Sequence, residues 1–307
     1  MSVIGIDTSN YTTSIAYFDG ETGVNCSRLL PVKPGELGLR QSDAVFAHTK
    51  SLPDLSGRLF SNAEVGKITA VGVSTRPRAV EGSYMPCFMV GYSHAKLLSD
   101  ALGVPLIEVS HQQGHVAASL WSAGHLELMD EPHLAWHLSG GTTELLLVEP
   151  EGRNVVCTKI GGTTDISAGQ LIDRTGQLLQ LPFPSGKHLD ALSKEAVMKE
   201  VFKVKCSNME FSLSGVQNKV QQFHEKNGKP EETAGYALRC VAKAVYLATE
   251  QALKAYPGLP VVFSGGVASN SLLRDVIAPL KPVFAQPQFS TDNAMGVAVL
   301  AHRITEA

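Results

Sequence analysis

The chain has 307 residues, of which 44% are hydrophobic and 18% charged, and its net charge is −3. Because single hydrophobic cores stop growing at about 250–300 residues, we expect two lobes. No apolar run reaches the ~18 residues that a membrane helix needs, so we expect no membrane association. Proteins that bind nucleic acid unaided are usually basic, and the slight negative charge predicts weak RNA binding by this chain alone.

The N-terminal residues and the cysteines both bear on the compartment. The first residues lack a basic stretch followed by a long apolar segment, so no secretory signal is expected. The cysteines are scattered and form no CxxC motif: Cys26, Cys87, Cys157, Cys206 and Cys240. An odd, dispersed set is typical of reduced thiols, and we expect a cytoplasmic protein.

The first predicted element is a β-hairpin over residues 3–20, with the sequence VIGIDTSNYTTSIAYFDG. Two apolar strands flank a polar turn there. A second stretch of the same pattern covers residues 134–152, LAWHLSGGTTELLLVEPEG. The recurrence suggests a duplicated lobe, in which each copy offers a loop to a shared cleft.

A helix is predicted to follow the apolar run VPLIEV, with Ser110 as its N-cap and Gly124 closing it. His111 and His115 lie four apart on this helix, so their side chains stand about 5–6 Å apart and can hold one metal ion. Ordinary histidines at a helix start remain the simpler interpretation of this stretch alone. A zinc protease would read HExxH, but Gln112 replaces the glutamate that would act as general base.

A second histidine pair shows how readily such spacing arises among ten histidines. His133 and His137 are also four apart, but they lie in the predicted strand HLAWHL. Residues four apart on a strand are about 13 Å distant, too far to share one ion. We interpret that pair as a coincidence.

Small-residue turns follow two of the predicted strands, as LSGGTTE at 138–144 and as FSGGVASN at 263–270. Bare backbone N–H groups in such turns can approach a phosphate or a nucleoside, although tight turns without a ligand explain each one equally well. Three turns of this kind in one chain, counting the first hairpin, favour a nucleotide cleft between the lobes. Neither a Walker A sequence nor a GxGxxG turn occurs.

The remaining predicted elements are helices over 166–181, over 233–255, after the turn at 261–275 with a cap near Ser269, and over 291–304. Hairpins mixed with helices indicate an α/β fold with a mixed sheet in each lobe. Asp173 and Asp190 are each most simply solvated carboxylates, and Asp292 is most simply a helix cap.

Taken in order, the motifs resemble those of the tRNA threonylcarbamoyladenosine transferases, formerly called glycoproteases or O-sialoglycoprotein endopeptidases. The resemblance runs from about residue 3 to residue 304. It is carried by GIDTSNYTTSIA, SHQQGH, LSGGTTELLLV, DISAGQLIDRTGQLLQLPFPSG, FSLSGVQN, FSGGVASNSLLR and STDNAMGVAVLA. The histidine pair, the strand-SGG turn, the GGVxxNxxLR loop and the TDN helix start are jointly specific.

The resemblance implies a two-lobed, actin-like ATPase fold of the ribonuclease H-like kind, with duplicated mixed sheets and a central cleft. We expect an N-terminal lobe over 1–106, completed by the C-terminal helix at 291–307. The other lobe, over 107–290, is expected to carry the metal and nucleotide loops. By position, the family's iron or zinc ligands correspond to His111, His115 and Asp292. Two histidines and a carboxylate leave coordination sites open, which suits a Lewis acid acting on a carbonyl.

The resemblance also implies a nucleotide site. The family's contacts correspond to Leu138, Ser139, Gly140, Gly141, Asp173, Gly186, Asp190, Gly265, Gly266 and Asn270. The implied enzyme is a metal-dependent transferase. It moves an L-threonylcarbamoyl group from threonylcarbamoyl-AMP to an anticodon-loop adenosine of tRNA, within a multi-protein tRNA-modification complex. No catalytic residue beyond the metal ligands is assigned, and a His₂Asp set serves iron and zinc alike.

Several family positions are altered near the expected cleft. The usual CDET has become Asn10-Tyr11-Thr12-Thr13, and a glycine-containing stretch is replaced by TRPRAVEGSYMP at residues 75–86. Thr142 replaces a histidine, and the usual GLKT has become GVQN, with Gln217 in place of the lysine.

These changes leave alternatives open. The chain could be a divergent paralogue that carries out carbamoyl transfer to another amine or handles ATP. It could also be a non-catalytic nucleotide-binding subunit. A metalloprotease is disfavoured because the sequence has no HExxH base.

Overall fold

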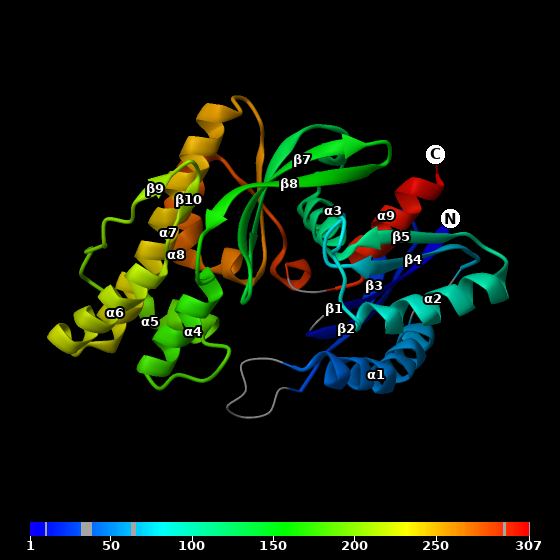
Figure 1. Cartoon of the computed structure of the whole chain (residues 1–307), viewed down its shortest axis with the longest axis horizontal. Coiled ribbons are helices and arrows are strands. Elements are labelled where there is room, and N and C mark those ends of the chain that lie inside the picture. The colour runs from blue at the N-terminus through cyan, green and yellow to red at the C-terminus, as the bar shows by residue number, and fades with distance from the viewer. Residues whose placement is uncertain (10, 32–38, 63–65, 291–292, 307) are drawn as a thin grey trace. The chain divides into compact units, whose positions relative to one another are not determined.

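The computed structural model describes residues 1–9, 11–31, 39–62, 66–290 and 293–306. By their contacts they form two compact units. Unit 1 comprises Met1–Glu131, Glu149–Cys157 and Asp292–Ala307, and unit 2 comprises Pro132–Val148 and Thr158–Thr291. Figure 1 shows the course of the chain through the helices and strands.

Unit 1 is built on a mixed five-stranded sheet in the order β3-β2-β1-β4-β5. Its strands are β1 (Ser2–Ser9), β2 (Thr12–Phe18), β3 (Gly23–Leu29), β4 (Ile68–Arg76) and β5 (Leu106–Ser110). The first three strands pair antiparallel, and β4 and β5 continue parallel to β1. The predicted hairpin over residues 3–20 is therefore confirmed as β1 and β2.

Helices cover both faces of this sheet: α1 (Gln41–Asn62), α2 (Phe88–Leu102), α3 (His111–Ala123) and α9 (Met295–Thr305). Alternate residues of β1 point to opposite faces. Ile4 and Ile6 pack in one core cluster with leucines of α1, whereas Gly5 lies directly against α9. Burial on both faces explains why every residue of β1 is buried.

Unit 2 is built on a seven-stranded sheet in the order β12-β11-β6-β7-β8-β10-β9. Its strands are β6 (His133–Leu138), β7 (Thr143–Glu151), β8 (Asn154–Thr163), β9 (Cys206–Ser207), β10 (Glu210–Phe211), β11 (Val261–Ser264) and β12 (Val283–Phe284). The end of β7 and the start of β8, within residues 149–157, belong to unit 1. The hairpin predicted over 134–152 is confirmed as β6 and β7, which pair antiparallel. His133 and His137 lie on β6, as predicted.

The helices of unit 2 are α4 (Ala168–Leu178), α5 (Gly186–Ser193), α6 (Ser214–Asn227), α7 (Pro230–Ala255) and α8 (Ser271–Ile277). Short 3₁₀ turns occur at Leu126–Asp130, Gly266–Ser269, Ala278–Leu280 and Pro287–Phe289, the first of them in unit 1. The core of unit 2 surrounds Trp136 of β6 and the alanine-rich face of α7. Small side chains on that face let the long helix pack closely on the other core elements.

Three predicted helices begin or end at other residues than expected. The helix predicted over 166–181 begins after a capping box at Ser167 and ends at Leu178, and the helix predicted from 233 starts at Pro230. The helix expected after a cap near Ser269 is confirmed, with the cap at the adjacent Asn270, because Ser269 closes a 3₁₀ turn. The last helix is α9, which begins at Met295, and the predicted cap at Thr291–Asp292 lies outside the described residues.

The division between the units also differs from the expected one. We expected a boundary after residue 106, but the contacts place it after Glu131. The physical reason is that β5 extends the first sheet beside β4, and α3 then packs against α9 (Figure 1). His111 and His115 therefore belong to unit 1, whereas the candidate nucleotide loops belong to unit 2.

Two further observations concern disulfide bonds and membrane-spanning helices. All five cysteines are free thiols. Within the ranges that the structure describes, none of the helices has both the length and the apolar character to cross a bilayer.

Candidate metal and nucleotide sites

The histidine pair is positioned by a strongly capped helix. Ser110 forms a capping box in which its Oγ accepts a hydrogen bond from the Gln113 amide at 3.2 Å, and Gln113 Oε1 accepts one from the Ser110 amide at 2.8 Å. Gly124 ends the helix in the left-handed region with φ of 76°. The predicted helix is therefore confirmed, and it places His111 and His115 one turn apart on the same face.

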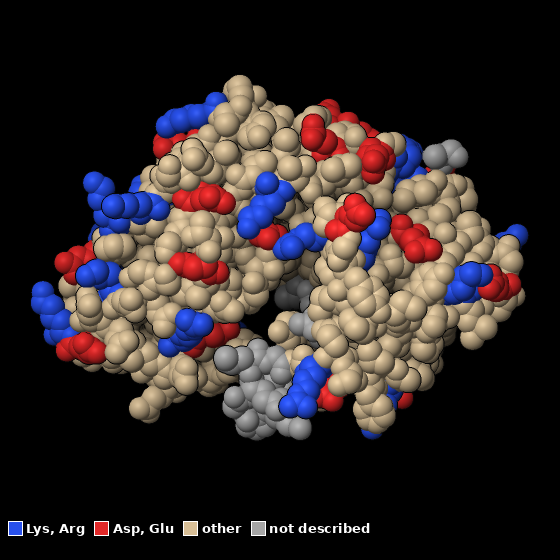
Figure 2. All heavy atoms as spheres, in the orientation of Figure 1, with Lys and Arg blue, Asp and Glu red and all other residues tan. Residues whose placement is uncertain are grey.

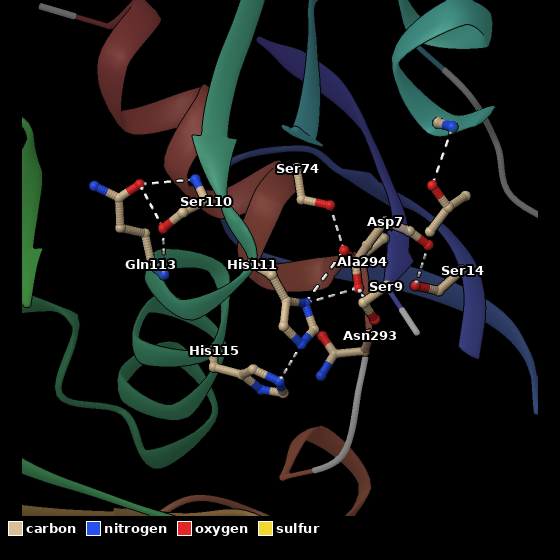
Figure 3. Close-up of polar contacts among 12 residues, drawn as sticks. Asp7, Ser9, Ser14, Ser74, Ser110, His111, Gln113, His115, Asn293 and Ala294 are labelled. Carbon is tan, nitrogen blue, oxygen red and sulfur yellow. Dashed lines mark hydrogen bonds and ion pairs between the residues drawn. The ribbon is translucent and has the colours of Figure 1, made fainter. Parts of the chain in front are cut away.

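The two imidazole rings converge (Figure 3). Nε2 of His111 lies 2.9 Å from Nε2 of His115, and the ring centroids are 4.3 Å apart. At this separation both nitrogens can lie about 2.0–2.1 Å from a single ion, the usual distance between zinc and a histidine nitrogen. His115 is buried, at 7% exposed, whereas the His111 side chain is 20% exposed, so one ring of the pair is reached by water. The two histidines could therefore supply two ligands of a metal site.

Asp7 is a site residue that the sequence analysis did not identify. It ends the run VIGID in β1, and its carboxylate lies 3.1 and 3.2 Å from Nδ1 of His111 (Figure 3). Asp7 is completely buried. A charged residue directly after the apolar run VIGI is the signal that could have revealed it, because aspartate is almost never fully buried unless paired.

The third expected metal ligand, Asp292, lies outside the described residues, and its role stays a prediction. Considering only the residues whose placement is described, no group of three histidine, cysteine or acidic side chains could hold an ion. The residues that follow Asp292 do reach the histidine helix: Gly296 lies against the backbone of Gly114. In Figure 3, Asn293 lies beside His111.

Some of the altered family positions in unit 1 are placed by the structure, whereas Asn10 lies outside the described residues. Thr13 is buried, and its hydroxyl lies 2.8 Å from Nδ1 of His48. Burial lowers the pKa of His48, although the nearby carboxylate of Asp7 opposes this effect. The Arg76–Arg78 stretch lies at the start of α3, because Arg76 pairs with Ser110 between the strands and the Pro77 carbonyl accepts a hydrogen bond from the Gln112 amide at 3.0 Å.

In unit 2 the predicted small-residue turns come together. The turn after Leu138 is closed by a hydrogen bond from the Ser139 amide to the Thr142 carbonyl at 2.8 Å. Its Gly140 carbonyl accepts a hydrogen bond from the Ser167 hydroxyl at 2.6 Å, at the start of α4. On the other side, Gly265 has φ of 90° and touches the backbone of Leu138 so closely that any side chain would collide with it.

The predicted carboxylates of unit 2 are not simply solvated. Oδ1 of Asp190 accepts hydrogen bonds from Asn270 Nδ2 at 2.7 Å and from the amide and hydroxyl of Ser271 at 3.0 and 2.8 Å. Asn270 also caps α8, since its Oδ1 accepts a hydrogen bond from the Leu273 amide at 2.9 Å. The structure therefore brings Asp190 and Asn270 together at the start of this helix.

Asp173 and Gly186 meet at the start of α5. Oδ1 of Asp173 accepts a hydrogen bond from the Ser185 amide at 2.8 Å, and Gly186 is the first residue of the helix. Burial raises the pKa of Asp173, and the bond from Ser185 partly opposes the shift. All ten predicted nucleotide-site residues thus lie in unit 2, and nucleotide binding by them stays a prediction.

Sequence comparison identifies the family. The family model of tRNA N6-adenosine threonylcarbamoyltransferase (TsaD) matches residues 37–299. A protein of that name from Carboxydothermus hydrogenoformans is 33% identical over 268 residues, which is 83% of this chain and 77% of the relative. Another from Thermosipho africanus is 30% identical over 322 residues, covering 99% of this chain and 94% of the relative.

Comparison with solved structures concerns the fold alone, because the sequence identities are low. Full-length HypF in a phosphate- and nucleotide-bound form has a TM-score of 0.61 at 15% identity. The match covers 100% of this chain and 47% of the HypF chain. The ROK hexokinase from Thermus thermophilus has a TM-score of 0.56 at 17% identity, with 100% of this chain and 99% of the hexokinase covered. The actin-like ATPase fold with two mixed sheets is confirmed, and the chain belongs to the tRNA N6-adenosine threonylcarbamoyltransferase family.

Proposed function

We propose that this protein transfers an L-threonylcarbamoyl group from threonylcarbamoyl-AMP to an anticodon-loop adenosine of tRNA. The observation that carries the proposal is the convergence of His111 and His115 at 2.9 Å on a capped helix, in a chain of this family. In the reaction, the adenosine amine bonds to the carbamoyl carbon, the bond from that carbon to the phosphate oxygen breaks, and AMP leaves. The amine gives up a proton.

We propose that His111, His115 and Asp292 hold one iron or zinc ion. Such an ion, when bound, supplies Lewis acid polarisation of the carbamoyl carbonyl. The contribution of the protein is to fix the ligands before substrate arrives. The capping box at Ser110 fixes the start of α3, and the close packing of Gly296 on Gly114 holds α9 and α3 together.

The nucleotide moiety is assigned to the loops of unit 2. Backbone N–H groups of the turn Leu138–Gly141 would hold the phosphate, because bare glycine amides approach anions closely. Gly265, Gly266 and Asn270 would contact the adenosine, with Asn270 fixed by Asp190 and by its capping bond. Asp173 would act through the start of α5, where it holds Ser185 next to Gly186.

We further propose that tRNA is engaged in the cytoplasm through a multi-protein modification complex. The net charge is −3, and basic and acidic side chains are interspersed among the described residues on the face shown in Figure 2. Phosphate neutralisation supplies most of the affinity for nucleic acid, so a surface of mixed charge favours partners that contribute basic residues.

The test is transfer of labelled threonylcarbamoyl from synthetic threonylcarbamoyl-AMP to an unmodified tRNA transcript. The tagged protein is isolated with its partners from the cells that make it. We expect modified adenosine from the wild-type complex and at least a 100-fold slower reaction with His111→Ala. His125→Ala is the matched control, because His125 is an exposed histidine of unit 1 whose Nδ1 lies 2.9 Å from Oε1 of Glu127. A wild-type complex that binds the adenylate and leaves tRNA unmodified would refute the proposal.

A second candidate function is favoured by the altered positions around the histidine helix. Thr13 is buried and bonded to His48, and two exposed arginines, Arg76 and Arg78, lie at the start of α3. Arginines bind carboxylate or phosphate groups well. A divergent paralogue that transfers a carbamoyl-type group to another amine would show AMP release with small amines and no product on tRNA.

A further inference from the structure

The Asp7 carboxylate is the most deeply buried charge beside the histidine pair. It receives hydrogen bonds from three side chains: Nδ1 of His111, the hydroxyl of Ser9 at 3.1 Å and the hydroxyl of Ser74. These donors come from the start of α3, from β1 and from β4. Such a carboxylate is held in one orientation by three separate elements (Figure 3).

This environment determines which nitrogen of His111 carries the proton. Both Asp7 carboxylate oxygens face Nδ1 of His111, at 3.1 and 3.2 Å, so the geometry points to a ring N–H at Nδ1, the arrangement in which a carboxylate commonly orients a metal-ligating histidine. The lone pair then lies on Nε2, the atom that faces His115. Only a deprotonated ring nitrogen can bind a metal. A histidine whose tautomer is already fixed with Nε2 deprotonated therefore binds the metal more tightly than one that interconverts between tautomers.

We infer that Asp7 is a positioning residue for the metal site: it holds the His111 ring with Nε2 deprotonated and directed toward the point shared with His115. The inference rests on the proposed metal site, since it concerns how one of its ligands is prepared. Asp7 would not touch the ion, because its oxygens are engaged by His111, Ser9 and Ser74.

The first test is metal affinity, measured by competition between the purified protein and a fluorescent chelator for Zn²⁺. Outer carboxylates of this kind are worth about 10–100-fold in affinity. We expect Asp7→Asn to weaken Zn²⁺ binding by that factor with an unchanged circular dichroism spectrum. Asp100→Asn is the control, because Asp100 is an exposed aspartate of unit 1 that pairs with Lys96 on the surface of α2.

The outcomes separate the inference from the proposal beneath it. A wild-type protein that fails to bind Zn²⁺ or Fe²⁺ refutes the proposed metal site. Wild-type binding that persists in Asp7→Asn within threefold refutes the positioning role while leaving the metal site intact.

The second test needs no change at Asp7 and so does not depend on that variant folding. Nitrogen NMR of metal-free protein with ¹⁵N-labelled histidine shows which ring nitrogen is protonated. The His111 signals are assigned by their absence in His111→Ala. We expect the Nδ1–H form at neutral pH. A His111 ring protonated at Nε2 overturns the inference.

Discussion

Gly296 offers a direct way to perturb the packing that holds the histidine helix. In α9 it lies against α3, and a Cβ at this position would lie 2.7 Å from the Gly114 carbonyl carbon, 2.8 Å from the Ala118 nitrogen, and closer still to the Gly114 oxygen. Ordinary contacts between such atoms are about 3.5–4.0 Å. Since these neighbours are backbone atoms that cannot rotate away, Gly296→Ala should force the two helices apart by about 1 Å.

The expected magnitude follows from two opposing effects. Overpacking of a tight interface costs about 1–3 kcal/mol, and contact with rigid backbone places this case near 3 kcal/mol. Alanine regains about 1 kcal/mol of helix propensity over glycine. The net destabilisation of α3 and α9 is therefore about 2 kcal/mol, which corresponds to roughly 30-fold more frequent local opening.

Hydrogen exchange followed by mass spectrometry measures that opening directly. Peptides from α3 and α9 in Gly296→Ala should exchange roughly 30-fold faster than in wild type when opening is in rapid equilibrium. Zn²⁺ affinity should fall as well, because ligand distances tolerate only about ±0.2 Å. Gly57→Ala in α1 is the control, since nothing lies within 4 Å of its added Cβ. Exchange in Gly296→Ala within threefold of wild type would show that the helices do not approach as described.

Three further predictions concern other parts of the chain. Gly169→Ala should weaken AMP binding, measured by calorimetry, at least tenfold, because the added Cβ would lie 2.5 Å from the Ser139 carbonyl oxygen. Gly215→Ala is the control: nothing lies within 4 Å of its added Cβ, and it should bind AMP as the wild type does. Hydrogen bonds from Ser212, Ser214 and backbone amides outweigh burial and hold the pKa of Asp165 well below its usual value. The carboxylate therefore stabilises the fold above the unfolded pKa of about 3.9 and progressively less as pH falls below it. In urea unfolding, Asp165→Asn should be less stable than wild type at pH 7, and a difference that persists undiminished at pH 2 would contradict this. Burial raises the pKa of Cys87 to about 11, so iodoacetamide at pH 8 should label it only after unfolding, as mass spectrometry would show.

Local signals explain what the sequence could predict. Ser110 and Gly124 mark the ends of α3 through their own capping chemistry, and both hairpins follow from alternating strands around polar turns. The cap expected near Ser269 also follows local chemistry, because the adjacent Asn270 is a strong N-cap residue. The side-chain amide of Asn270 in addition donates a hydrogen bond to Asp190.

The contacts that the sequence could not reveal join distant positions. Asp7 and His111 are 104 residues apart, and they meet only because β5 leads into α3 at the edge of a parallel arrangement with β1 and β4. No local pattern specifies that strand order. Distant contacts also explain why the unit boundary lies after Glu131 and not after residue 106, since nothing near residue 106 indicates that the following helix packs on α9.

The return of α9 to unit 1 has a consequence for biosynthesis. Ribosomes deliver the chain in order, and domains generally fold as they emerge. Unit 1 cannot complete its fold until residues 295–305 have been translated, after the whole of unit 2, because these residues cover Gly5 and Gly72 of its sheet. Until then α3 lacks its packing partner and the first sheet exposes an apolar face, a state that chaperones recognise. We therefore expect unit 2 to fold on the ribosome first, and the histidine pair to be held in place only after α9 has been translated.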